Sequence, residues 1–407
     1  MNVLSLFDGM SCGQQALERS GIKVDNYFAS EIDKYAIQVT MANYPNTIQL
    51  GSVTEVDGYS LPKIDLLIGG SPCQSFSFAG KRKGMATKCE TEILTLEHYL
   101  ELKADGYEFE GQSYLFWEFM RLLNEVKPRY FLLENVMMGE KWEKVLSKAI
   151  GVKPIEINSA LVSAQNRRRL YWTNIGMQPA GLFGDLESII KQPKDKKILL
   201  KDILESDVDE KYFISQKMID GFLAHNKRHI EEKNQTGFNW KPTRGNKKAN
   251  CLRANAALCA TDNSIIVHNT MPRSSTSGKG GTGHLSRIDG KTYCLDTENT
   301  NAVEIKKVIQ LSQNNKSNGG TQPYQQDRIY DINGISPALQ AQLSNGSTMI
   351  NTSRIRRLTP IECERLQTVK DNYTNHVSDS QRYKMLGNGW TIDVIAHIFS
   401  YINEKKV

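Results

Sequence analysis

A cysteine and a glutamate in the first third of this 407-residue chain each follow an apolar run that is typical of a buried strand. Cys73 stands directly after Pro72 in a polar, glycine-rich stretch, and Glu134 directly follows Leu132 and Leu133. A thiolate is the usual nucleophile of covalent catalysis, and a carboxylate can act as an acid or as a hydrogen-bond partner. A lone cysteine is more often a small buried apolar residue, and a lone glutamate is more often an ion-pair partner. The polar stretch around Cys73 favours a thiol in a loop.

A row of arginines precedes the apolar run Leu170-Tyr171-Trp172. In a strand, Gln165, Arg167 and Arg169 would project to one face, and Arg168 would project to the other. Three consecutive arginines usually lie on a solvated surface, but a row on one face beside a catalytic cleft can bind anions.

A glycine-containing turn is expected between the first strand and the first helix. Glycines there let the backbone approach a ligand closely, although the Gly-x-x-x-Gly spacing is not the dinucleotide fingerprint. Glu31 ends the second expected strand, where an acid can hydrogen-bond ribose hydroxyls. The alternative interpretation of the same residues is a tight turn without a ligand, followed by a surface glutamate. In both interpretations the turn consists of Phe7, Asp8, Gly9, Met10, Ser11, Cys12 and Gly13.

Alternating strand and helix patterns over the first 175 residues must position these side chains. This alternation predicts a parallel sheet covered by helices on both faces, with Cys73 and Glu134 at the carboxyl edge of the sheet. The expected strands are residues 2–7, 26–30, 47–50, 64–68, 130–133 and 155–158, and the expected helices are residues 13–20, 34–43, 115–126 and 140–149.

The composition of the chain changes beyond Gly176, and residues 240–350 are rich in Asn, Ser, Thr, Gly and Gln. Similar five-residue segments begin at Lys248, Lys291 and Ile335, and each precedes a strand-like run, which predicts repeated short hairpins. Further helices are expected at residues 215–224 and 390–402. A capping box with proline at the first helical position predicts another helix, and it is formed by Thr359, Pro360 and Glu362.

The overall composition excludes several classes of protein. Hydrophobic residues make up 39% of the chain and charged residues 24%, which is ordinary for a soluble globular protein. No apolar stretch is long enough to span a membrane, and the start lacks the basic region of a signal peptide. The seven cysteines include no Cys-x-x-Cys pair, which argues against structural zinc or a disulfide framework and favours a cytoplasmic location.

The net charge of +6 is unevenly distributed. Residues 225–285 carry ten basic and three acidic side chains, which favours contact with phosphates, although such runs are usually solvated faces. Residues 86–112 carry seven acids and two lysines. They are interpreted as a solvated helical insertion or, alternatively, as a docking surface or lid extension that faces away from phosphate.

Taken together and in order, these motifs resemble those of the DNA (cytosine-5)-methyltransferase family. The sequences of the first turn and of Gly69-Gly70-Ser71-Pro72-Cys73 are most similar to those of the animal de novo enzymes. The region between the N-terminal and C-terminal groups of motifs instead resembles bacterial or viral members. The matching motifs are Pro72-Cys73, Glu134-Asn135-Val136, the Gln165 to Arg169 run, the segment from Arg357 to Gln367, and Gly387-Asn388-Gly389-Trp390.

The resemblance implies a fold and a division of the chain. The fold is α/β, with the Rossmann-like, mostly parallel sheet of an S-adenosylmethionine-dependent methyltransferase and a smaller inserted target-recognition domain. Residues 1–178 would form the catalytic domain and residues 179–353 the target-recognition domain. Residues 354–407 would complete the catalytic domain by returning beside the first strand.

The resemblance also implies a cofactor, S-adenosyl-L-methionine, and no metal. Glu31 would bind the ribose. Where the family often has an acid for the adenine amino group, Ser52 and Val53 offer only a hydroxyl. The other cofactor residues would be Phe7, Asp8, Gly9, Met10, Ser11, Cys12, Pro72, Asn388, Gly389 and Trp390.

The implied reaction is transfer of a methyl group to C5 of a cytosine that has been flipped out of duplex DNA of a specific sequence. Cys73 would add to C6, Glu134 would hydrogen-bond or protonate N3, and Arg167 and Arg169 would orient the base and its phosphate. The chain is expected to act as a monomer in a bacterial or phage-infected cell. The sequence leaves open the target sequence and whether a cognate restriction endonuclease accompanies the enzyme.

Two other functions compete with this one. An RNA methyltransferase could use the same catalytic domain, but the long inserted region favours major-groove reading of DNA. A catalytically silent DNA-binding subunit is the second rival. The presence of Cys73, Glu134, Arg167 and Arg169 argues against it.

Overall fold

The chain divides into two compact units, each of which is built from segments that are distant in the sequence. The first unit comprises Met1–Leu204, Thr243–Asn263 and Leu358–Val407, and the second comprises Glu205–Pro242 and Ser264–Arg357. The computed structural model describes residues 1–72, 85, 91–109, 111–180, 185–215, 217–221, 224, 247–252, 264–269 and 352–402.

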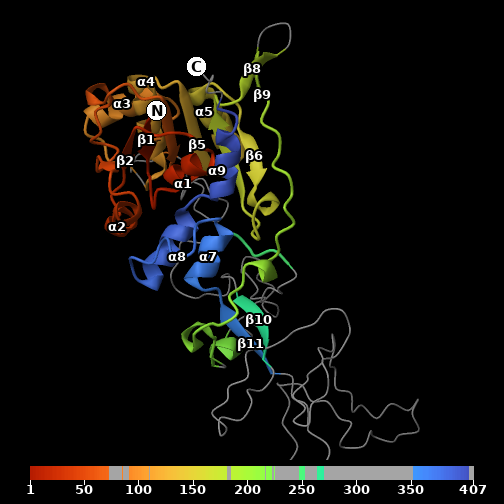
Figure 1. Cartoon of the computed structure of the whole chain (residues 1–407). Coiled ribbons are helices and arrows are strands. Elements are labelled where there is room, and N and C mark those ends of the chain that lie inside the picture. The colour runs from red at the N-terminus through yellow and green to blue at the C-terminus, as the bar shows by residue number, and fades with distance from the viewer. Residues whose placement is uncertain are drawn as a thin grey trace, which may run out of the picture. The chain divides into compact units, whose positions relative to one another are not determined.

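A seven-stranded sheet forms the centre of the first unit (Figure 1). Its strand order is β3-β2-β1-β4-β5-β7-β6, and every neighbouring pair is parallel except those that involve β7. This arrangement confirms the predicted mostly parallel α/β sheet. The strands are β1 (Asn2–Leu6), β2 (Asn26–Ser30), β3 (Ile48–Gln49), β4 (Leu66–Gly70), β5 (Tyr130–Val136), β6 (Ile155–Asn158) and β7 (Arg168–Thr173).

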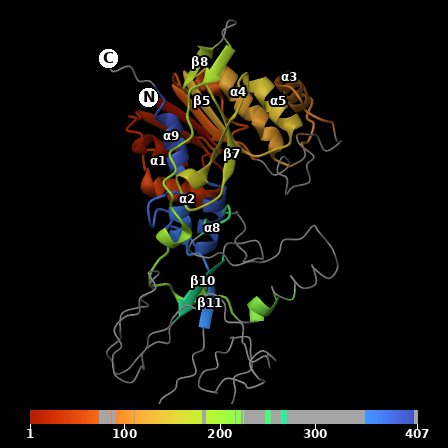
Figure 2. The same ribbon diagram turned by 90° about the vertical axis from the view of Figure 1, so that its right-hand side faces the viewer.

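Helices cover both faces of this sheet, as the alternating sequence pattern predicted. Figure 2 shows α1, α2 and α9 on one side of the sheet, and α3, α4 and α5 on the other. Because the central strands are buried on both faces, their sequences are continuous apolar runs rather than alternating ones. The helices are α1 (Cys12–Arg19), α2 (Lys34–Asn43), α3 (Leu96–Ala104), α4 (Phe116–Val126), α5 (Glu140–Ile150) and α9 (Ile392–Phe399).

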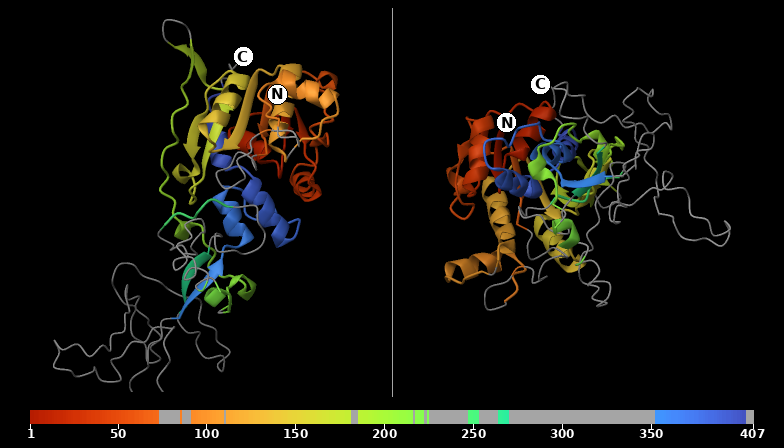
Figure 3. Two further views of the ribbon diagram at one scale, coloured as in Figure 1. Left: turned by 180° about the vertical axis from the view of Figure 1, so that it is seen from behind. Right: turned by 90° about the horizontal axis from the view of Figure 1, so that it is seen from below.

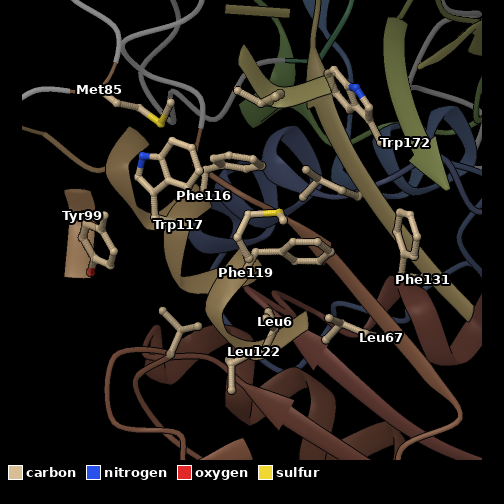
Figure 4. Packing of buried hydrophobic residues seen from close by; sticks show 14 of the residues in the cluster. Leu6, Leu67, Met85, Tyr99, Phe116, Trp117, Phe119, Leu122, Phe131 and Trp172 are labelled. Atoms are coloured by element: carbon tan, nitrogen blue, oxygen red, sulfur yellow. The ribbon is translucent and has the colours of Figure 1, made fainter. Parts of the chain in front are cut away.

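The main hydrophobic core lies between α4 and the sheet (Figure 4). Phe116, Phe119 and Leu122 of α4 are fully buried, and their spacing of three residues places them on one face of the helix. Trp117 on the same helix is also fully buried, so α4 contributes more than one stripe to the core.

The C-terminal segment returns to the first unit as three helices. The capping box predicted at Thr359 is present, because its hydroxyl accepts from the amide of Glu362 and the Glu362 carboxylate accepts from the amide of Thr359. The last helix begins two residues later than the predicted start at Trp390, and it packs against α1. The two helices before α9 are α7 (Pro360–Leu366) and α8 (Asp379–Asn388).

In the second unit, β10 (Ser264–Asn269) pairs antiparallel with β11 (Thr352–Arg357) (Figure 3). The strand-like run at residues 265–267 is therefore a strand, and residues 217–221 and 224 are helical within the helix expected at residues 215–224. Two of the three repeat segments, and most of the basic stretch 225–285, lie outside the described residues. The remaining elements are β8 (Met177–Ala180), β9 (Asp185–Ser188) and short 3-10 turns at Gly58–Ser60, Ser113–Leu115, Ser159–Leu161, Leu200–Asp202 and Glu210–Tyr212.

The acidic insertion at residues 86–112 contains α3, and this helix is attached to α4 through one buried carboxylate. Glu118 is fully buried, and it accepts hydrogen bonds from the Tyr99 hydroxyl at 2.5 Å and the Lys103 ammonium at 2.6 Å. Arg121 donates to the second carboxylate oxygen from Nε at 2.8 Å. Burial opposes ionisation of Glu118, but these three donors outweigh it and lower the pKa of the carboxyl. The described part of the insertion thus contains the helix α3, whose inner face is held by Glu118.

Replacing Glu118 with alanine should destabilise the protein by about 1–3 kcal/mol, because the buried Tyr99 hydroxyl and the largely buried Arg121 would each lose an acceptor. Urea unfolding followed by tryptophan fluorescence measures this as a lower midpoint. The matched control is Glu140→Gln, which breaks the exposed Glu140–Lys144 pair and should leave the midpoint unchanged. A Glu118→Ala variant with the midpoint of the control would contradict the proposed attachment.

Candidate active site

The ends of four neighbouring parallel strands bring most of the predicted site residues to one edge of the sheet. β1 leads into the turn that begins at Phe7, and β2 leads into Glu31. β4 ends at Gly70, directly before Ser71 and Pro72, and β5 carries Glu134 near its end. In open α/β sheets, ligands bind outside the carboxyl ends of the strands.

The turn after β1 has an unusual backbone. Phe7, Gly9 and Ser11 have φ angles of 57°, 57° and 60°, so three residues within five are left-handed. Only glycine adopts this conformation without cost, and non-glycine residues keep it where the surroundings enforce it, often at functional sites. The turn therefore gives a fixed surface on which a ligand can lie against backbone atoms.

Glu31 is one of the groups that hold this turn. One oxygen of its carboxylate accepts from the amide of Gly9 at 2.8 Å, and the other accepts from the amides of Ile32 and Asp33 at 2.7 and 2.8 Å. A carboxylate oxygen has two acceptor positions. The oxygen bonded to Gly9 thus retains capacity for a ligand hydroxyl, as the predicted ribose contact requires.

Asp8 is buried beneath the same turn. Its Oδ1 accepts from the Tyr27 hydroxyl at 2.7 Å, while its Oδ2 is buried without a hydrogen-bond partner. Burial raises the pKa of Asp8 to about 6, and the hydrogen bonds from Ser5, Tyr27 and Ser11 only partly oppose this. An unpaired buried carboxylate oxygen is costly in the free protein, and a cationic ligand would relieve that cost.

The segment after α8 closes over the turn. A Cβ at Gly389 would lie 2.8 Å from the end of the flexible Met10 side chain and 3.1 Å from the Met385 carbonyl oxygen, so a larger residue here would require its neighbours to shift. Cys12 is buried 3.8 Å from the Trp390 carbonyl oxygen, and burial raises the pKa of its thiol to about 12. The Cys12 thiol is therefore poorly suited to act as a second nucleophile, and its predicted place in the cofactor site stays a prediction. Tyr373, which sequence analysis did not single out, donates to the Met10 carbonyl at 2.8 Å.

The remaining predicted cofactor residues lie around this edge without a common contact. The Ser52 hydroxyl is 2.7 Å from the Thr54 hydroxyl, and Val53 is buried with its carbonyl accepting from Arg121. Pro72 is half-buried and Asn388 is exposed. Their roles toward a cofactor remain predictions.

Glu134 is held by two donors from other elements. Arg169 Nε lies 3.0 Å from one carboxylate oxygen, and Trp390 Nε1 lies 3.2 Å from the other. The Glu134 and Arg169 side chains are only 11% and 14% exposed, so this ion pair is largely removed from water. A Cβ at Gly70 would lie 2.9 Å from Trp390 Nε1 and 3.1 Å from Glu134 Oε2. Glycine at this position therefore makes room for the contact.

The arginine row divides as the strand pattern predicted. Arg167 is buried, and Arg168 is exposed and pairs with Glu156 at 2.6 Å. Arg167 donates to the carbonyls of Gly387 and Gly389 at 3.2 and 2.9 Å. Its guanidinium thus fixes the segment that closes over the turn after β1, residues 7–13, which we call the cofactor turn after its predicted role. The predicted contact of Arg167 with base and phosphate stays a prediction.

Cys73 lies outside the described residues, and the structure describes only how the chain approaches it. Asn135 donates to the Ser71 hydroxyl at 3.0 Å and to the Ser71 carbonyl at 3.3 Å. This amide ties the start of the Pro72-Cys73 loop to the strand that carries Glu134. Asn135 belonged to the motif that identified Glu134, but nothing in its sequence position revealed this second contact.

The fold and this edge define a class of protein, the S-adenosylmethionine-dependent methyltransferases. The residues present fit such a cofactor, because Glu31 retains capacity for ribose and the unpaired Asp8 oxygen suits a cationic ligand. Within the described part of the chain, no cluster of three or more His, Cys, Asp or Glu side chains has the arrangement of a metal site.

The chain belongs to the family described as C-5 cytosine-specific DNA methylase, whose model matches residues 1–150 and 157–404. It is similar to the orphan methyltransferase M.SPRI of Bacillus phage SPR, with 27% identity over 100% of this chain and 99% of that protein. It is also similar to the type II methyltransferase M.HgiCI of Herpetosiphon aurantiacus, with 26% identity over 95% and 93% of the two chains. The family and enzyme class predicted from the motifs are thus confirmed.

A solved structure supports the fold independently. The Entamoeba histolytica methyltransferase EhMeth superimposes with a TM-score of 0.54 over 98% of this chain and 97% of that chain, at 15% identity. Among the described residues, no helix is both long enough and apolar enough to cross a membrane.

The buried Asp8 carboxyl predicts a pH-dependent stability. Its pKa is raised from 3.8 to about 6, so its ionisation disfavours the folded state progressively as pH rises from 4 to above 6. Asp8→Asn should therefore raise the free energy of unfolding by up to about 3 kcal/mol at pH 8 and by much less at pH 4.5.

Urea unfolding at the two pH values measures the difference. Tyr27→Phe, which removes the donor to the same carboxylate, is the matched control and should lower stability at pH 8. A gain for Asp8→Asn that is equal at both pH values would contradict the assigned cause.

Proposed function

We propose that this chain transfers a methyl group from S-adenosyl-L-methionine to C5 of a flipped cytosine in a specific duplex DNA sequence, through a covalent bond between Cys73 and C6. The observation that carries the proposal is the carboxylate of Glu134, which Arg169 and Trp390 hold beside the start of the Pro72-Cys73 loop. Membership of the C-5 cytosine-specific DNA methylase family supports it.

The mechanism follows from the chemistry of cytosine, whose C5 is a weak nucleophile. The Cys73 thiolate adds to C6 and thereby raises the electron density at C5. Glu134 hydrogen-bonds N3 or donates a proton to it, which stabilises the charge that develops on the ring. When bound, the cofactor supplies an electrophilic methyl group. Once C5 carries the methyl group, its proton passes to solvent water and the bond between C6 and sulfur breaks. The Cys73 thiolate is thereby released and the aromatic ring is restored.

The two held oxygens of Glu134 support this role. The Arg169 guanidinium and the Trp390 indole fix the plane of the carboxylate, so that little reorganisation is needed when the base arrives. Arg169 also keeps a permanent positive charge next to the group that interacts with N3. We propose that Arg167 and Arg169 orient the base and its phosphate in the complex.

We further propose that residues 179–353 recognise the target sequence, with the basic stretch 225–285 against DNA phosphates. The expected partner is double-stranded DNA, and the expected location is the cytoplasm of a bacterial or phage-infected cell, where the chain acts as a monomer. The similar proteins include both orphan and type II methyltransferases. A cognate restriction endonuclease is proposed as a partner only if the gene for one accompanies that of this chain.

Replacing Cys73 with alanine should abolish methylation, because the covalent bond to C6 requires the thiolate of this residue. Bisulfite sequencing of DNA from cells that express the chain measures the product and reveals the target sequence. Wild-type protein should also form a covalent adduct with a duplex that contains 5-fluorocytosine at the target. Methylation or adduct formation by Cys73→Ala would refute the assignment of Cys73 as the nucleophile. Absence of new 5-methylcytosine in cells that express the wild-type chain would instead favour an RNA methyltransferase or a catalytically silent DNA-binding subunit.

Replacing Glu134 with glutamine should lower kcat by about 10²–10⁴-fold, because the amide cannot donate a proton to N3. Binding of S-adenosyl-L-methionine, measured by calorimetry, should change little. The control is Glu156→Gln, which breaks the exposed pair with Arg168 and should leave kcat unaltered. Wild-type turnover by Glu134→Gln would refute its role.

A further inference from the structure

A short segment from the middle of the chain, residues 247–252, lies within the first unit beside the arginine row. Ala249 pairs with Gln165 in a parallel bridge, in which its amide donates to the Ala164 carbonyl at 2.7 Å and its carbonyl accepts from the Asn166 amide at 3.0 Å. The Leu252 amide donates to the Gln165 side chain at 3.3 Å. The segment therefore runs in a fixed register along the residues that lead into Arg167.

Lys248 anchors this register. Its ammonium donates to the carbonyls of Ala160, Ser163 and Ile198 at 2.7, 3.0 and 2.7 Å. An ammonium has three donors, and here each one is used. Lys248 thus fixes the position of the segment, including that of the residue three positions later in the sequence.

That residue is Cys251, and its sulfur faces both catalytic arginines. Arg167 Nη1 lies 3.3 Å from the sulfur and Arg169 Nη2 lies 3.8 Å from it. Burial alone would raise the pKa of this thiol, but the two guanidiniums outweigh burial and lower it. A sulfur with thiolate character is an acceptor for both cations.

The same two guanidiniums have their other contacts in the active site. Arg169 pairs with Glu134, and Arg167 binds the carbonyls of Gly387 and Gly389. One sulfur therefore lies at the junction of the catalytic carboxylate and the segment that closes the cofactor turn. Loss of that sulfur would leave one donor of each arginine free to turn away.

We propose that Cys251 is a positioning residue, which holds the guanidiniums of Arg167 and Arg169 in place and through Arg169 fixes the orientation of Glu134. The inference rests on the proposed function. It assigns to the Lys248-Ala-Asn-Cys-Leu252 segment, noted in the sequence only as a weak repeat, a part in catalysis. Because Cys251 is proposed to act through Arg169 on the orientation of Glu134, its main effect should be on turnover rather than on binding.

The test compares Cys251→Ala and Cys251→Ser with the wild-type chain in steady-state methylation of duplex DNA. Cys251→Ala should lower kcat about 10-fold or more, because a small displacement of a catalytic group is costly, while KM for DNA and for the cofactor stays within about twofold. Cys251→Ser keeps an acceptor and should recover part of kcat. Cys363→Ala, which removes a buried thiol of α7, controls for loss of packing and should leave kcat unchanged.

Thermal unfolding of each variant separates positioning from folding. Unaltered kcat in Cys251→Ala, or a loss of activity that only follows the unfolded fraction, would overturn the proposal. A raised KM with normal kcat would also overturn it, because that result would make Cys251 a binding residue. An inactive wild-type chain is a different result, which refutes the proposed function itself and this inference with it.

Discussion

The carboxylate of Glu134 is the point at which three separate parts of the chain meet. It extends from β5, and its two oxygens are held by Arg169 at the start of β7 and by Trp390 after α8. A largely buried ion pair stabilises little by itself, because desolvation offsets much of the Coulomb attraction. Its value here is orientation, since a carboxylate with both oxygens held cannot rotate. The antiparallel pairing of β7 with β5 is what brings Arg169 to this edge, opposite Val136.

The cofactor turn is costly to fold. Phe7 and Ser11 adopt left-handed backbone conformations, and Asp8 is buried with one oxygen unpaired. The surroundings enforce both features, through Glu31 at the amide of Gly9 and Tyr373 at the carbonyl of Met10. Stability is commonly sacrificed in this way where a ligand, when it binds, supplies the missing interactions.

The sequence predicted what depends on local pattern and missed what depends on distant contacts. Continuous apolar runs located the strands, and Thr359-Pro360 with Glu362 located a helix start, because strand burial and helix capping leave short-range signals. The inward direction of Arg167 followed from strand alternation. Its partners, the carbonyls of Gly387 and Gly389, could not be predicted, since backbone acceptors carry no residue type. The contact of Cys251 with two arginines was hidden for a related reason, because a segment 84 residues away supplies it.

Trp390 contacts Glu134 across 256 positions of sequence, and this distance has a consequence for how the protein is made. Domains fold as the ribosome delivers them, beginning at the N-terminus. The sheet and its first helices can form early, but the indole that holds Glu134 and the helix that packs against α1 emerge only after residue 390. A chain interrupted earlier carries the Glu134 carboxylate without one of its two donors. The contact that fixes Glu134 is therefore completed only when the C-terminal segment has been synthesised.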